Sequence, residues 1–320
     1  MLADKLMSVV PSAASSRGLF VGGGNPTSTT VIDYIEISTP GNATDFGDCT
    51  ATKSISSASN GSSDRAVWGG GYDTGGNYVN VIEYITISTP GNSSDFGDLE
   101  SNMIGVVGTS NGTNDRGIFA GGYIAGSGTQ SAIRYATISS TSNTTSFGNL
   151  INGYYSSRSV CSNGANERGV FLNGGGAKSR DIEYITISST GDSADFGDLM
   201  ALQGAGNAYG VTGGGGTSNL TGERGVYCCG QYSAMTNVIQ YFTISTLGNA
   251  SDFGDMTNAQ NDIGGTTSGV TGDTAVMAPM DTESANLTID YFTISTTGNS
   301  SDFGDLSVAR SYMGIMSNAD

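Results

Sequence analysis

The chain contains no histidine and few positive charges. Twelve lysines and arginines stand against 29 aspartates and glutamates, which gives a formal net charge of −17. The lack of histidine removes the usual general base, so we expect no activated serine nucleophile. A nonspecific nucleic-acid binder needs a basic surface, so we expect no nucleic acid partner. The acidity would also repel an anionic membrane, and without a long apolar run we expect no membrane insertion.

Cysteine is scarce as well, with four residues at Cys49, Cys161, Cys228 and Cys229. Their spacing forms no CxxC or Cys/His pattern, which argues against a zinc site and against a disulfide framework. We therefore expect small buried thiols and no cofactor. Residues 1–16 hold only a short apolar stretch, too short for a signal peptide.

Glycine is abundant, at 50 of 320 residues, while charged residues make up only 13%. Hydrophobic residues still amount to 37%, which is enough for a core. Glycine-rich turns between β-branched and aromatic runs predict an all-β protein.

A Phe-Gly pair recurs about every 50 residues. Its phenylalanines are Phe46, Phe96, Phe147, Phe196, Phe253 and Phe303. Each pair follows a strand pattern such as VIEYITIST (81–89), in which Ile82 and Tyr84 point to one face and Ile85 and Ile87 to the other. Apolar residues on both faces indicate a sheet packed between two neighbours, as in a propeller blade.

Two further strands complete each repeat. A shorter apolar strand ending in glycines precedes the first, as in RGIFAGG (116–122), and another follows the Phe-Gly pair, as in residues 101–112 and 157–164. Four strands in each of six copies predict a six-bladed β-propeller that forms a single domain over residues 1–320, after a short N-terminal segment 1–16.

The repeat is split between the two chain ends. The chain starts in mid-repeat with RGLFVGGG (17–24) and ends with a strand in 308–320. We expect the C-terminal strand to pair with the N-terminal strands and close the ring, which hides two sheet edges. The acidic residue before the arginine in the middle copies (Asp64, Asp115, Glu167, Glu223) returns as Asp320.

A glycine doublet, a tyrosine and an aromatic residue in this order, as in Gly70-Gly71, Tyr84 and Phe96, resemble the kelch repeat. The resemblance covers nearly the whole chain and implies a kelch-like propeller. Kelch repeats usually have tryptophan where this chain has phenylalanine, so the partners of kelch proteins are not carried over.

Five arginines share one repeat position: Arg17, Arg65, Arg116, Arg168 and Arg224. They could form a ring that grips an anionic ligand on the axis. Alternatively, each could bind carbonyls or an aspartate of the DFGD segment and fasten blade to blade. Because the position repeats with the fold, we favour the structural role.

Aspartates three residues apart, such as Asp45 and Asp48, flank the Phe-Gly pair in five copies. We expect a turn in which the carboxylates cap backbone amides. Calcium binding and glycoside cleavage by paired carboxylates are the alternatives.

Recognition is expected in the loops that follow the glycine runs, because they differ in length and sequence between copies. They span residues 25–30, 72–80, 123–131, 177–180, 231–237 and 280–287. Tyr72, Tyr78, Tyr123 and Tyr232 in these loops are the candidate binding residues, suited to carbohydrate or protein contacts. The alternative is that the loops are ordinary solvated turns.

The repeat signature D/EYITIST…GNxSDFGDL is similar to repeats in structural proteins of tailed bacteriophages, marine and cyanobacterial ones above all. This resemblance implies a non-enzymatic virion protein, in a tail, a fibre or a decoration of capsid or tail. Its partners would be other virion proteins and a host-surface glycan or protein. Two alternatives stay open: a carbohydrate-active propeller enzyme, such as a kelch-type sugar epimerase, and an intracellular kelch-like scaffold.

Overall fold

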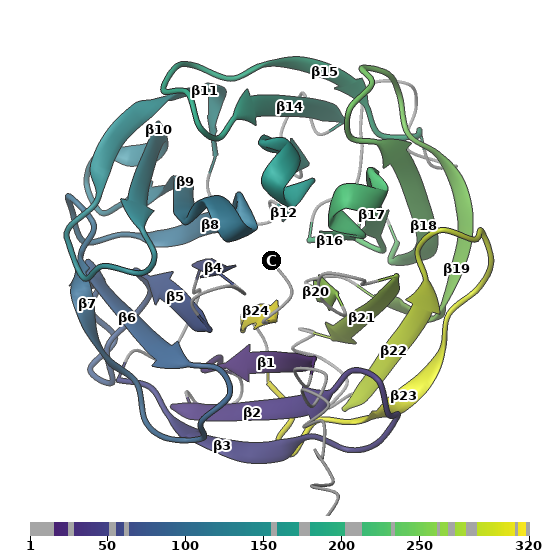
Figure 1. The fold of residues 1–320 in the computed structure, drawn as a ribbon, viewed down its shortest axis with the longest axis horizontal. Helices are drawn as coiled ribbons and strands as arrows, with labels where there is room; N and C mark the ends of the chain where they lie inside the picture. Colours follow the sequence, from purple (N-terminus) through teal and green to yellow (C-terminus); the bar gives the residue numbers. More distant parts are fainter. Residues whose placement is uncertain are drawn as a thin grey trace, which may run out of the picture.

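Six four-stranded antiparallel sheets surround a central axis and form a six-bladed β-propeller (Figure 1). The computed structural model describes residues 16–24, 29–50, 56–60, 64–154, 159–172, 180–201, 213–231, 234–260, 263–267, 273–279, 287–310 and 313–317. In each blade the strands run from the axis to the rim in the order in which the chain makes them, except in blade 1, where the last strand of the chain is innermost.

The first three blades have these strands, in order from the axis outward. Blade 1 has β24 (Gly314–Ser317), β1 (Arg17–Val21), β2 (Val31–Glu36) and β3 (Thr44–Asp48). Blade 2 has β4 (Ser56–Asn60), β5 (Arg65–Gly69), β6 (Val81–Thr86) and β7 (Ser94–Asp98). Blade 3 has β8 (Ile104–Ser110), β9 (Arg116–Ile124), β10 (Gly128–Thr137) and β11 (Thr145–Tyr154).

The other three blades follow the same order. Blade 4 has β12 (Ser159–Ser162), β13 (Arg168–Leu172), β14 (Asp181–Thr186) and β15 (Ala194–Asp198). Blade 5 has β16 (Gly215–Ser218), β17 (Arg224–Cys228), β18 (Thr236–Thr243) and β19 (Ser251–Gln260). Blade 6 has β20 (Ile263–Thr267), β21 (Thr274–Pro279), β22 (Thr288–Thr293) and β23 (Ser301–Asp305).

The ring closes in blade 1, as the split repeat predicts. β24 pairs antiparallel with β1, from Gly18 opposite Ser317 to Val21 opposite Gly314. Figure 1 shows the yellow β24 beside the purple β1 at the axis. The matching acidic residue, Asp320, lies outside the described residues.

The core is divided into six clusters, and each lies between two neighbouring blades. Ile85 of blade 2 packs toward blade 1 with Phe46, whereas Ile82 and Tyr84 of the same strand pack toward blade 3 with Phe119. This confirms that the third strand of each blade is covered on both faces. Most of the burial that stabilises the fold is therefore at the boundaries between blades, at about 1.5–3 kcal/mol per large apolar side chain.

The DFGD segment is not the turn that its sequence suggests, because it forms the outermost strand of each blade. Its glycine is required by a close approach of the next blade. A Cβ at Gly47 (φ +150°) would lie 2.4 Å from the carbonyl oxygen of Gly91, and the same clash recurs around the ring up to Gly304 against Gly41. The pattern of small and acidic residues thus reflects blade contact at the rim.

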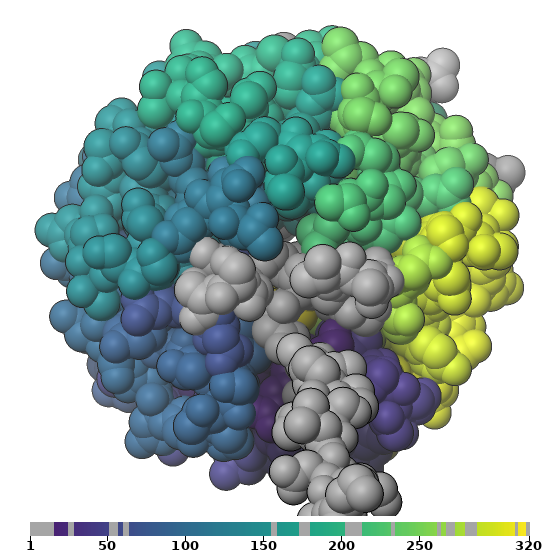
Figure 2. Space-filling view, in the orientation of Figure 1, coloured from purple at the N-terminus to yellow at the C-terminus, as the bar shows by residue number. Residues whose placement is uncertain are grey.

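The two ends of the propeller differ in their connections. On one end, which we call the turn face, the 3-10 turns η2 (Gly112–Asn114), η3 (Gly164–Asn166) and η4 (Leu220–Gly222) join the innermost to the second strands. The turns between third and fourth strands lie there too, and they have one length in all blades (37–43, 87–93, 138–144, 187–193, 244–250 and 294–300). Figures 1 and 2 view the molecule from this face.

The opposite end, the loop face, carries the connections between second and third strands and the segments that lead from one blade to the next. These connections vary, from residues 125–127 in blade 3 to 70–80 in blade 2. The predicted loop 123–131 is mostly strand, because β9 and β10 extend into it. No helix in the described part of the chain is long and apolar enough to cross a membrane.

Candidate functional site

The five recurrent arginines lie at the blade boundaries on the turn face. Arg116 Nη1 donates a hydrogen bond to the carbonyl oxygen of Ile187 in the next blade at 2.9 Å, and its guanidinium lies over the ring of Tyr135 at 4.4 Å. The other four make the same two contacts: Arg17 with Ile87 and Tyr34, Arg65 with Ile138 and Tyr84, Arg168 with Ile244 and Tyr184, Arg224 with Ile294 and Tyr241. This geometry supports the structural role of these arginines.

The aspartates of the DFGD strands lie at the rim and are exposed or half-exposed. Asp302 accepts a hydrogen bond from the backbone N–H of Gly304 at 3.1 Å, as predicted for these carboxylates. The cap that recurs comes from the next blade: Asn92 Oδ1 accepts a hydrogen bond from the backbone N–H of Asp48 at 3.0 Å. Equivalent bonds occur at all six boundaries, including Asn42 to Asp305 across the closing one. Among the described residues no group of three acidic or cysteine side chains could hold a metal ion.

A ring of buried polar residues was missed in the sequence. The third strand of each blade carries one at the position before its tyrosine: Asp33, Glu83, Arg134, Glu183, Gln240 and Asp290, all at most 2% exposed. Each binds the residue that lies four positions after the phenylalanine of the preceding blade. Glu83, for example, accepts from the N–H and the hydroxyl of Thr50 at 3.1 and 2.6 Å. These residues hold the chain where it passes from blade to blade.

Two members of this ring depart from the common arrangement. In blade 3 the polarity is reversed, because Arg134 donates to the carboxylate of Glu100. In blade 1 Asp33 forms a fully buried ion pair with Arg310 at 2.9 Å. Arg310 also donates to the carbonyl oxygens of Phe20 and Val31, so it ties the segment before β24 to blade 1.

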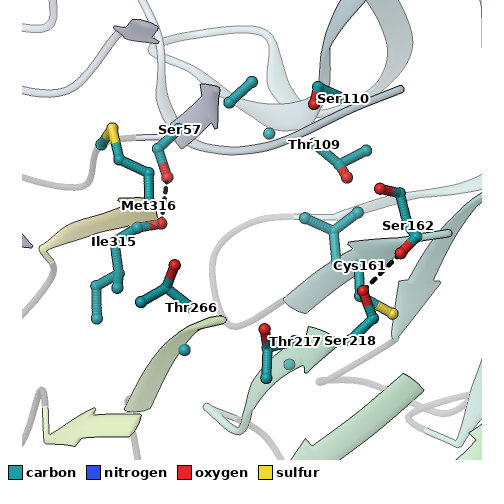
Figure 3. Close-up of a pocket in the computed structure, with 15 residues that line it drawn as sticks. Ser57, Thr109, Ser110, Cys161, Ser162, Thr217, Ser218, Thr266, Ile315 and Met316 are labelled. Atoms are coloured by element: carbon teal, nitrogen blue, oxygen red, sulfur yellow. Dashed lines mark hydrogen bonds between the residues drawn. The ribbon is translucent and has the colours of Figure 1, made fainter. Parts of the chain in front are cut away.

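The innermost strands enclose a cavity of about 60 Å³ on the axis (Figure 3). Its polar lining is made of serine and threonine hydroxyls, and none of its described lining residues is charged. Ser57 and Ser218 donate their hydroxyls to carbonyl oxygens of the preceding blades, at Ile315 and Ser162. The space admits a few water molecules, and the buried Thr266 hydroxyl, which has no partner in the described protein, is placed to bind one. This uncharged lining does not match the arginine ring considered above for an anionic ligand on the axis.

The axial strands also share a sequence pattern. A Ser-Asn pair ends the innermost strand in five repeats, at Ser59, Ser110, Ser162, Ser218 and Ser317. Asn111 accepts from the N–H of Arg116 at 2.7 Å and donates to Glu167 of the next blade at 2.9 Å. The asparagine therefore orders its own turn and joins it to the neighbour.

The four cysteines are buried, which confirms the expected small buried thiols. Burial raises the pKa of Cys49 and of Cys229 to about 12 and that of Cys228 well above its ordinary value. These thiols are therefore protonated at neutral pH and are not nucleophiles.

Three of the four candidate tyrosines meet on the loop face, between blades 2 and 3. Tyr72 and Tyr78 face each other across a short antiparallel bridge, with ring centroids 5.2 Å apart in an edge-to-face arrangement. Tyr123, in β9 of blade 3, lies 6.3 Å from Tyr78, again edge to face. The fourth candidate, Tyr232, lies outside the described residues.

An open cleft of about 570 Å³ adjoins this tyrosine cluster. It is lined by Gly76, Asn77, Tyr78, Ser101, Asn102, Ile124 and Ala125. The lining comes from the connection of blade 2, the segment that leads to blade 3, and the hairpin of blade 3. Only the fold brings Tyr78 close to residues 101–102 and 124–125, which are distant from it in the sequence.

No protein-family model matches this chain, and no curated protein matches it.

Proposed function

We propose that the protein is a non-enzymatic virion component of a tailed bacteriophage, placed in a tail, a fibre or a decoration of capsid or tail. Its role there is particle assembly or attachment to the host surface, with other virion proteins and a host-surface glycan or protein as partners. The observation that carries the recognition role is the tyrosine cluster beside an open cleft, on the face whose connections vary between blades. The phage-like repeat signature supports the assignment to a particle.

The use of the charged repeat positions argues for a display platform over an enzyme. The recurrent arginines and the buried carboxylates bind neighbouring blades. Burial raises the pKa of Asp290, but this carboxylate accepts hydrogen bonds from Thr257 and Ser300 and lies inside a blade boundary. A rigid ring that holds dissimilar loops suits recognition, and many copies on one particle would strengthen weak contacts.

The test is to quantify the protein in purified particles by mass spectrometry and to locate it by imaging. We expect a fixed copy number per particle and no turnover of sugar substrates by the purified protein. Absence from particles together with turnover of a sugar would establish the enzyme instead. Absence from particles with one dominant host protein in a pull-down would establish the intracellular scaffold.

A further inference from the structure

We propose that the cleft between blades 2 and 3 binds a neutral saccharide, with Tyr78 as the residue on which a sugar ring packs. This inference rests on the proposed role in surface recognition and names the ligand class. The cleft has a volume of about 570 Å³ and is wide open to solvent, a form that suits one or two units of a longer chain.

The lining has the chemistry that a neutral sugar needs. The C–H face of a pyranose packs on an aromatic ring, while its hydroxyls need groups that both donate and accept hydrogen bonds. Tyr78 supplies the ring, and the side chains of Asn77, Asn102 and Ser101 supply amides and a hydroxyl. None of the described lining residues is charged.

The charge of the protein decides between neutral and acidic glycans. A sulfated, sialylated or uronic-acid glycan would approach a protein of net charge −17 at a cleft with no basic side chain in its described lining. Repulsion and the loss of hydration of its carboxylates would both oppose binding. A neutral saccharide meets neither cost.

The cleft is also preorganised, because the connection that carries Tyr78 is held at both ends. Asp73 accepts from the backbone and the side-chain N–H groups of Asn77 at 2.8 and 2.9 Å, and these bonds lower the pKa of Asp73. The N–H of Gly71 donates to Met103, whose own N–H donates to Val79. This connection therefore loses little conformational entropy when a ligand binds.

Calorimetric titration with cellohexaose, maltohexaose and mannohexaose tests the inference, with hexagalacturonate as the acidic match. We expect at least one neutral hexasaccharide to bind and hexagalacturonate not to bind. Tyr78→Ala should weaken that binding at least tenfold, and Tyr78→Phe should stay within about threefold because the ring is kept. Leu247→Ala, at an exposed site on the turn face, is the matched control and should bind as the wild type does.

Three results would overturn the inference: no binding of any neutral hexasaccharide, preference for hexagalacturonate, or unchanged binding by Tyr78→Ala. The same protein is scored for its presence in particles. A protein present in particles that binds no neutral saccharide refutes the ligand alone, whereas a saccharide-binding protein absent from particles refutes the virion role alone.

Discussion

The boundaries between blades and the cleft between blades 2 and 3 use polar side chains in opposite ways. At the boundaries, Arg116, Glu83 and Asn92 occupy positions that recur in most repeats, and each binds the backbone of an adjacent blade. In the cleft, Tyr78 and Asn102 occupy positions outside the repeat pattern and border open space. The difference teaches that a repeated polar residue in this ring holds the fold, whereas recognition is expected at residues outside the pattern.

The largest loss of stability should come from opening the ring at its closing boundary. Deleting residues 308–320 removes β24 with its buried Met316, the buried Met313 just before it, and Arg310, the partner of Asp33. Loss of two large side chains at about 1.5–3 kcal/mol each, together with an exposed β1 edge, should cost several kcal/mol. Chemical denaturation followed by circular dichroism measures this cost. A truncated protein that unfolds at the same denaturant concentration as the full chain would show that closure is not needed.

Arg310→Met isolates the ion pair of the closing boundary. It leaves the Asp33 carboxylate buried without its partner, which typically costs about 3–5 kcal/mol. The double variant Arg310→Met with Asp33→Leu should recover most of that loss, because an apolar pair of similar size replaces a buried ion pair well. A double variant as unstable as the single one would mean that the carbonyl contacts of Arg310, and not its charge, hold the boundary.

The reversed pair in blade 3 can be converted to the arrangement of blade 2. Arg134→Glu places two carboxylates together at a position 1% exposed, and we expect a loss of about 3 kcal/mol. Adding Glu100→Thr recreates the Thr50–Glu83 contact and should restore most of the stability. Urea denaturation of both variants measures the two values, and a double variant that stays unstable would show that the boundaries are not interchangeable.

A smaller effect is expected at the rim. Asn143→Ala removes the acceptor for the N–H of Asp98, a bond of 3.0 Å that water can replace. The loss should be about 0.5–1.5 kcal/mol, measured by denaturation against the equivalent Asn299→Ala at another boundary. A much larger loss at one boundary than at the other would contradict the equivalence of the rim contacts.

Much of the fold could be predicted because one repeat predicts all six blades. Two-sided strands such as residues 81–86 indicated packing between neighbours, and the split repeat indicated closure. The DFGD strand was mistaken for a turn because aspartate and glycine usually favour turns. Here the glycine is needed because the backbone of the next blade leaves no room for a Cβ atom, a contact that is seen only in the assembled ring.

The site was less accessible to prediction for two physical reasons. The residue before the tyrosine of each third strand is an acid, a base or an amide in different blades. Such a variable polar position is typical of an exposed side chain, and only the packing shows that it is buried and binds a partner from the preceding blade. The tyrosines were predicted because they lie in loops that vary between repeats, but Tyr78 meets Tyr123 only because the connection of blade 2 ends beside the hairpin of blade 3. Sequence spacing does not fix such a meeting.

The measurement that tests the account most directly compares Arg116→Ala with Tyr78→Ala in two assays, thermal unfolding and titration with the neutral hexasaccharide that binds the wild type best. Arg116→Ala removes a charged hydrogen bond and a contact with Tyr135, about 1–3 kcal/mol. It should melt a few degrees lower and bind the saccharide unchanged at temperatures where it is folded. Tyr78→Ala loses the contacts of a half-buried ring with Tyr72 and Tyr123, so it should also melt a few degrees lower, but it should bind at least tenfold more weakly at temperatures where it is folded. An Arg116→Ala protein that stays as stable as the wild type but loses binding would contradict the division between scaffold and recognition.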